Sequence, residues 1–227
     1  RKGLAACAKH IPFKFKGKNF LIRASKPVEE RFIGNAFMFN EEERSRVLKN
    51  PTGKYNHTEL TKPFYDKVRD QDQVTQMQYI DLHLWMTGDI LLKADKMSMA
   101  HSLELRVPFL DRKVMELAEQ IPVKDRVTET ETKYAMRLAA LQACPPQTAK
   151  KKKLGFPVPI RVWLKEDKYY NIVKNKFTSP QSAQFFHTDK LVQLLDDHRA
   201  GKYDYSRKIW TVFSFLVWYD VYFSDNV

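Results

Sequence analysis

Glycine is scarce in this chain, and its positions constrain the fold more than any other feature. The 227 residues contain seven glycines, at positions 3, 17, 34, 53, 88, 155 and 201, and no two lie closer than fourteen residues. Loops that cradle phosphate need clustered glycines, because backbone N–H groups must approach the anion without a Cβ in the way. The chain therefore contains neither a P-loop nor a dinucleotide-binding fingerprint. Any nucleotide that it handles must have its main cradle elsewhere.

The size and composition favour a single folded domain. Hydrophobic residues make up 43% and aromatic residues 13% of the chain, which excludes wholesale disorder. No apolar run is long enough to span a membrane, and no signal peptide is present, so we expect a cytoplasmic protein. The two cysteines, Cys7 and Cys144, have no partner at disulfide-framework or metal-ligand spacing. We therefore expect no metal site within these residues.

Positive charge is concentrated in two blocks. The net charge is +12, and residues 1–31 and 150–176 each carry nine Lys/Arg against two acidic residues. Two basic blocks on a near-neutral body indicate a polyanion, either a nucleic acid or the phosphates of a nucleotide. A solubilising surface is the simpler alternative for the first block.

The hydrophobic pattern predicts a mainly α fold with little or no sheet. Residues 1–10 are typical of the end of a helix whose start is missing, which suggests a fragment, and 14–23 could form an extended segment. The predicted helix caps are Ser25, Asn40, Asp89, Asp111 and Thr128, the last paired with Glu131 in a capping box. The expected helices cover about 41–48, 72–88, 89–100, 112–121, 129–144, 160–176, 189–199 and 208–223. The last is apolar almost all round, as in a buried core helix.

Two features could carry chemistry. Asp89 and Asp95 are six residues apart and fall on different helix faces, so Asp89 is either a helix cap or a lone functional carboxylate. Lys150–Lys153 lie beside Gly155 and Pro157, which hold them on a loop. The run is either a solvated surface or an anion site, where one lysine could neutralise charge developing on a phosphoryl group.

Three segments carry a family resemblance. They are DILLKADKMSMAHSLELRVPFLD at 89–111, KYAMR at 133–137 and KKLGFPVP at 152–159. Together they resemble, in order and at plausible spacing, the signature segments of glutamine-hydrolysing asparagine synthetases. The resemblance is strong over about 80–165 and looser in the flanks.

The resemblance implies a fold and an activity. Residues 1–227 would form one unit, the helical C-terminal part of an α/β synthetase domain of the adenine-nucleotide alpha-hydrolase-like (ATP-pyrophosphatase) type. The N-terminal glutaminase domain and the glycine-rich ATP-binding loops are absent from the sequence. The family activates the side-chain carboxylate of aspartate with Mg-ATP, giving a β-aspartyl-adenylate and pyrophosphate, and ammonia from glutamine then displaces AMP. The fragment alone is expected to be inactive.

The resemblance also implies roles for four residues. Lys153 matches the family lysine that contacts the phosphates during adenylation, so it would be catalytic. Asp89 lies near a family acid that lines the substrate pocket. Arg106 and Asp111 are family hallmarks, which we interpret as structural braces of that pocket. ATP and Mg would be bound mainly by upstream residues, and the partners would be the glutaminase domain and, in a homodimer, a second copy.

Two alternatives stay open. The β-lactam synthetases and lasso-peptide cyclases share the scaffold and adenylate other carboxylates. A basic helical module that binds nucleic acid would use the two charged blocks, but the chain lacks an interleaved aromatic and basic motif for that work.

Overall fold

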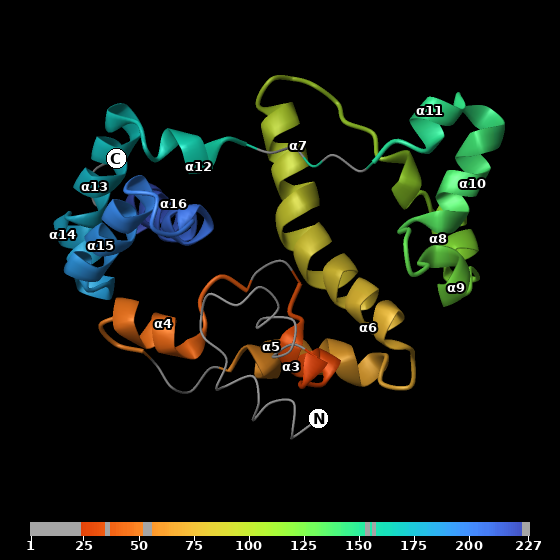
Figure 1. The fold of residues 1–227 in the computed structure, drawn as a ribbon, viewed down its shortest axis with the longest axis horizontal. Coiled ribbons are helices and arrows are strands. Elements are labelled where there is room, and N and C mark those ends of the chain that lie inside the picture. Colours follow the sequence, from red (N-terminus) through yellow and green to blue (C-terminus); the bar gives the residue numbers. More distant parts are fainter. Residues whose placement is uncertain (1–23, 35–36, 52–55, 153–154, 156–157, 224–227) are drawn as a thin grey trace. The chain divides into compact units, whose positions relative to one another are not determined.

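The chain folds into two compact units. The computed structural model describes residues 24–34, 37–51, 56–152, 155 and 158–223 (Figure 1). The first unit comprises 1–36 and 56–154, and the second comprises 37–55 and 155–227. The predicted helix at 1–10 and the predicted extended segment at 14–23 lie outside the described residues.

Both units are helical, as predicted. Over the described residues no β-sheet forms, and isolated bridges pair Leu48 with Phe186 and Val127 with Thr132. The first unit contains α3 (Val28–Arg31), α5 (His57–Lys67), α6 (Gln73–Ile80), the π-helix η1 (Asp81–Leu91), α7 (Leu92–Met99), the 3₁₀ helix η2 (Pro108–Leu110), α8 (Arg112–Glu119), α9 (Val123–Arg126), α10 (Tyr134–Ala143) and α11 (Pro146–Ala149). The second unit contains α4 (Glu41–Val47), α12 (Ile160–Trp163), α13 (Asp167–Phe177), α14 (Pro180–Phe185), α15 (Thr188–Arg199) and α16 (Ser206–Phe223).

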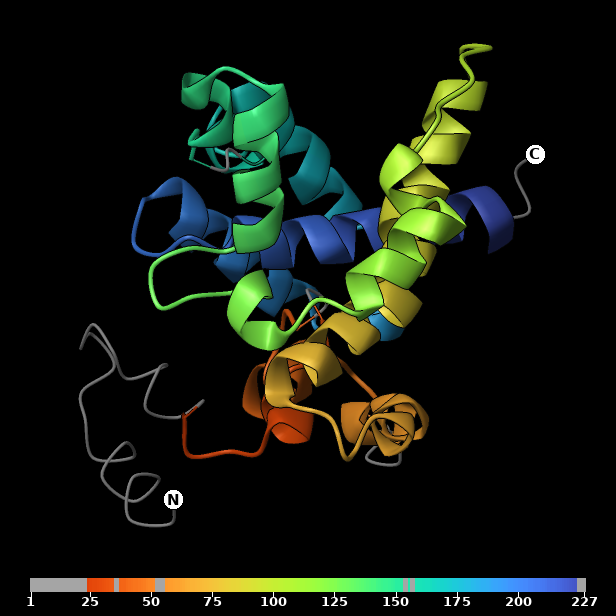
Figure 2. The same cartoon turned by 90° about the vertical axis from the view of Figure 1, so that its right-hand side faces the viewer.

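The longest element of the first unit corrects the predicted break at Gly88. α6, η1 and α7 run on as one continuous rod, which Figures 1 and 2 show in yellow. It begins at the predicted position, where the Asp72 carboxylate accepts from the backbone N–H groups of Val74 and Thr75 at 2.8 and 2.9 Å. Gly88 and Asp89 lie inside the π-helical stretch, so the predictions of a stop at Gly88 and a cap at Asp89 are wrong. The helix continues because Gly88 does not take the left-handed conformation with which a glycine usually ends a helix.

A small core holds α3, α5 and α6 together in the first unit. Val28, Tyr65 and Ile80 are buried in it. The Tyr65 hydroxyl donates to the backbone carbonyl of Phe32 at 2.7 Å, which satisfies the polar end of the ring. Burial raises the pKa of Tyr65 to about 12. This core therefore fixes α3 and α5 against α6, the first part of the long rod.

The predicted helix caps have mixed outcomes. Asn40 forms the full capping box with Glu43 at the start of α4, and Asp111 caps α8, so both predictions are confirmed. Ser25 is not a cap, because α3 starts only at Val28. Thr128 does accept from the N–H of Glu131, but the two residues close a turn ahead of α10 instead of starting it.

The second unit packs α13, α15 and α16 around one core. Phe177, Leu191, Leu195, Ile209 and Leu216 are almost fully buried in it. The predicted helix over 160–176 is in fact two, α12 and α13, and α14 was not predicted.

α16 is buried on one face only, which corrects the prediction of an all-round core helix. Trp210 and Trp218 are each 47% exposed, whereas Ile209 and Leu216 on the other face are buried. Within the described part of the chain, no helix has both the length and the apolar character to cross a bilayer.

Candidate functional site

The basic segment Lys150–Lys152 follows a short helix that the prolines create. Pro145 and Pro146 end α10, as predicted, and Pro146 begins α11. The N–H groups of Lys150 and Lys151 then donate to the carbonyls of Pro146 and Thr148, at 3.0 and 3.2 Å. The three lysines are exposed at the end of this turn. Their ammonium groups are therefore accessible to an anion.

Arg137 holds the backbone of this segment. Its Nη1 donates to the carbonyl oxygens of Ala149 at 3.1 Å and of Lys151 at 3.0 Å, and its Nε donates to Thr132 at 3.2 Å. One guanidinium thus joins the turn before α10 to the last residue of α11 and to Lys151 beyond it. Arg137 belongs to the signature segment KYAMR, but the sequence alone predicts no role for it. The carbonyls that it holds lie twelve and fourteen residues further on, and no helical periodicity relates them to Arg137.

Lys133, from the same signature segment, has an unusual backbone conformation. It occupies the left-handed region at φ 60° and ψ 36°, at the N-cap position of α10. A non-glycine residue in this region costs on the order of 1 kcal/mol and is found often at functional sites. Its carbonyl accepts from the N–H of Arg137 at 2.9 Å. The left-handed conformation of Lys133 thus lies at the point where the chain enters α10, the helix that carries Arg137.

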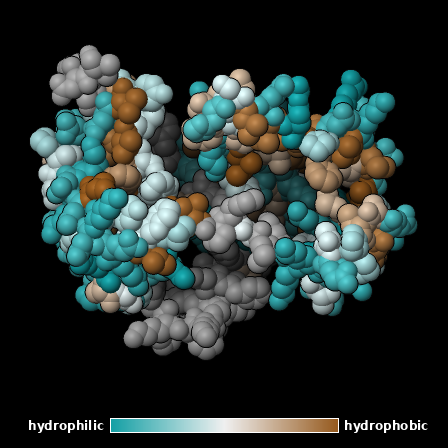
Figure 3. Space-filling view, turned by 90° about the horizontal axis from the view of Figure 1, so that it is seen from above, coloured by the Kyte–Doolittle hydropathy of each residue, from teal (hydrophilic) through white to brown (hydrophobic). Residues whose placement is uncertain are grey.

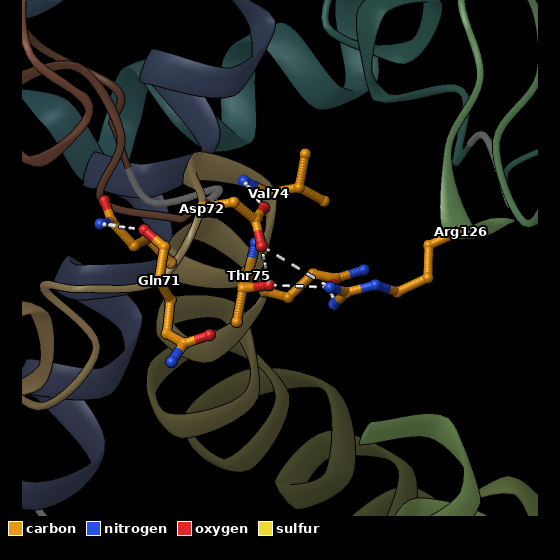
Figure 4. Close-up of polar contacts among 7 residues, drawn as sticks. Gln71, Asp72, Val74, Thr75 and Arg126 are labelled. Carbon is orange, nitrogen blue, oxygen red and sulfur yellow. Dashed lines mark hydrogen bonds and ion pairs between the residues drawn. The ribbon is translucent and has the colours of Figure 1, made fainter. Parts of the chain in front are cut away.

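A second arginine ties α9 to the start of the long rod (Figure 4). Arg126 donates from Nη1 to Gln78 at 2.7 Å and from Nη2 to the Thr75 hydroxyl at 2.9 Å, and it lies 3.7 Å from the Asp72 carboxylate. Burial raises the pKa of Asp72, but hydrogen bonds from Thr75 and Val74 and the charge of Arg126 outweigh it, so the pKa lies below its usual value. α9 is thereby anchored where the chain turns toward α10.

The predicted site residues have separate local environments. Lys153 lies outside the described residues. Asp89 is exposed on the rod, where it accepts from the Trp85 indole N–H at 3.0 Å and lies 3.6 Å from the Lys93 ammonium group. Arg106 is exposed and paired with Glu104. The Asp111 carboxylate accepts from the N–H of Lys113 at 2.9 Å, which is its capping bond.

A cavity of about 690 Å³ lies between α5, α6, η1, α8 and α9. Lys67, Asp81, Glu119 and Arg126 are among its lining residues. The Oδ1 atom of Asp81 is buried without a hydrogen-bond partner, and burial raises the pKa of this carboxyl. Across the described ranges, no three His, Cys, Asp or Glu side chains gather in a way that could hold a metal ion.

Comparison with known proteins identifies the family. Residues 11–220 match the family of asparagine synthases, so the chain belongs to that family. This confirms the resemblance inferred from the three signature segments. The match includes parts of both units.

Named relatives are found in several bacteria. Glutamine-hydrolysing asparagine synthetase 1 of Bacillus subtilis (strain 168) is 43% identical over 221 residues, which cover 97% of this chain and 35% of the relative. A Mycobacterium tuberculosis protein, provisionally named a glutamine-hydrolysing asparagine synthetase, is 39% identical over 227 residues, 100% of this chain and 35% of its own length. The chain thus spans about a third of the length of these relatives. No solved structure gave a significant match.

Proposed function

We propose that the intact protein makes asparagine from aspartate, ATP and glutamine, and that residues 1–227 are the helical C-terminal portion of its synthetase domain. The observation that carries this proposal is the 43% identity to Bacillus subtilis asparagine synthetase 1, which extends over 97% of the chain. The exposed basic segment beside Arg137 supports it, because ammonium groups suit the phosphates of ATP.

The chemistry has two steps. A side-chain carboxylate oxygen of aspartate attacks the α-phosphorus of ATP, the bond to the β-phosphate oxygen breaks, and pyrophosphate leaves. The nitrogen of glutamine-derived ammonia then attacks the activated acyl carbon, a proton is lost, and AMP leaves. Negative charge develops on the phosphates in the first step, so a fixed lysine lowers its barrier.

Lys153 is the residue that we assign to this task. It directly follows the described lysines, and its family counterpart contacts the phosphates. Mg²⁺ would neutralise further phosphate charge, and we expect its ligands outside this chain. Asp89 would line the substrate pocket from the rod, whereas Arg106 and Asp111 would act as structural braces.

The remaining assignments concern the whole protein. We propose a glutaminase domain as the ammonia source, a cytoplasmic location, and a homodimer as the assembly. The isolated 227 residues would be inactive, because their sequence has no glycine-rich phosphate cradle.

The test is exchange of labelled pyrophosphate into ATP by the intact protein, with aspartate, with glutamate or with no amino acid. We expect exchange with aspartate alone, and asparagine formation once glutamine is added. Exchange that requires a different carboxylate would favour a cyclase or β-lactam synthetase activity. Exchange with none, combined with salt-sensitive binding of nucleic acid, would favour the basic binding module.

A further inference from the structure

We propose that Arg137 is the positioning residue of the basic segment, so that Lys150–Lys152 present their ammonium groups to one bound polyphosphate. This inference rests on the proposed function, in which the polyphosphate is that of ATP. Arg137 itself touches backbone carbonyls and is not placed in contact with the ligand.

The first argument is geometric. A guanidinium carries five N–H donors in a rigid plane, whereas a lysine ammonium is a single point of charge. Arg137 uses two of its nitrogens to reach three carbonyls, those of Thr132, Ala149 and Lys151. An arginine suits this arrangement better than a lysine, because its donors lie in a rigid plane and point in several directions. The anchor is firm, because Ala149 is 6% exposed and packs in the interior.

The second argument is electrostatic. Arg137 brings a further positive charge within hydrogen-bond distance of the Lys151 backbone, next to the lysines on either side of it in the sequence. For folding alone this is unfavourable, since like charges at short range repel. A neutral donor could hold the same carbonyls without that cost. When an anion binds, each of these cations attracts it, and this attraction outweighs the repulsion between the cations.

The third argument is the chain of supports behind Arg137. Arg126 fixes α9 on the rod, the Val127–Thr132 bridge closes the following turn, and Lys133 enters α10 in a left-handed conformation. Each support precedes Arg137 in the chain and restricts where its guanidinium can lie. The segment 126–137 is therefore held at several points, and its last residue, Arg137, contacts the backbone of Lys151.

The experiment uses the intact protein with Arg137→Ala, Arg137→Lys and, as a matched control, Arg69→Ala. Arg69 is 59% exposed and pairs with Asp66 on the surface. Hydrogen exchange is measured on peptides that cover residues 146–152, where the N–H groups of Ala149, Lys150 and Lys151 are hydrogen-bonded to the preceding turn. Aspartate-dependent pyrophosphate exchange and glutamate release from glutamine are measured on the same samples.

We expect Arg137→Ala to accelerate hydrogen exchange over 146–152 and to lower pyrophosphate exchange about 10- to 100-fold, the range that a misplaced group can cost. Glutamate release should stay unchanged. Arg137→Lys keeps the charge but not the fork, so it should remain impaired, whereas a purely electrostatic role would let it recover. Arg69→Ala should behave as the unsubstituted protein does.

Unchanged hydrogen exchange over 146–152 in Arg137→Ala, or wild-type pyrophosphate exchange in Arg137→Lys, would overturn the proposal. If the unsubstituted protein shows no aspartate-dependent exchange, the proposed function fails. In that case the hydrogen-exchange comparison alone decides whether Arg137 positions the segment.

Discussion

At the scale of single residues, Asp81 is a partly buried carboxylate with an unsatisfied oxygen. Its Oδ1 is buried without a partner, and burial raises its pKa. A carboxyl whose pKa is raised in the folded state stabilises the fold fully below its unfolded pKa of about 4, and this contribution is lost as the pH rises through the folded pKa. At neutral pH the ionised Asp81 therefore opposes folding of the first unit.

Replacing Asp81 by Asn removes the charge and keeps the shape. We expect the free energy of unfolding of the chain to rise at pH 7, by at most about 1 kcal/mol because solvent screens this partly exposed charge, and to change little at pH 3. Urea unfolding at both pH values measures this. A loss of stability at pH 7 would show that the carboxylate has a cationic partner in solution.

Residue-scale features were predictable where the interaction is local. Asn40 and Asp111 were recognised as caps because the bonds they accept come from residues two or three positions away. The contacts of Arg137 could not be predicted in this way, because its acceptors depend on how α11 packs against α10. Short-range hydrogen bonds can be read from spacing, whereas tertiary ones need the fold.

At the scale of elements, the rod over 73–99 shows where the prediction of helix ends fails. Glycine and the following aspartate are typical stop and cap residues, and Gly88–Asp89 matched that pattern. The chain continues helically because Gly88 takes no left-handed conformation and Asp89 instead bonds to Trp85, one turn earlier. Gly201, which does have a positive φ of 73°, ends α15 as predicted.

The two glycines should respond oppositely to alanine. A Cβ at Gly88 would meet nothing within 4 Å, so Gly88→Ala should stabilise the chain by about 0.5–1 kcal/mol through helix propensity. Gly201→Ala should destabilise it by about 1 kcal/mol, because alanine is strained at positive φ. Thermal or urea unfolding of both variants checks the signs. Destabilisation by Gly88→Ala would mean that the rod breaks there after all.

At the scale of the whole molecule, the chain exposes apolar side chains in both units (Figure 3). Phe109 and Leu117 in the first unit are 68% and 64% exposed, and α16 presents Trp210 and Trp218 in the second. Exposed apolar area on this scale is typical of surfaces that another part of a protein covers. This exposed apolar area is consistent with the comparison, in which the chain spans 35% of the length of Bacillus subtilis asparagine synthetase 1.

The mainly helical class was predictable from the chain as a whole, but the division into two units was not. Helical periodicity and the lack of glycine clusters are properties of the sequence itself. The division depends on residues 37–55 packing with 155–227 far along the chain, for example where Leu48 pairs with Phe186. Such pairings leave no periodic trace.

The most direct test of the account is Lys153→Ala in the intact protein, with Arg69→Ala, whose side chain pairs with Asp66 on the surface, as the control. Aspartate-dependent pyrophosphate exchange and glutamate release are measured side by side. We predict that Lys153→Ala lowers exchange about 100-fold, the usual cost of losing one group that stabilises developing charge, while glutamate release stays within twofold. Arg69→Ala should leave both activities unchanged. Exchange by Lys153→Ala at the level of the unsubstituted protein would contradict the account.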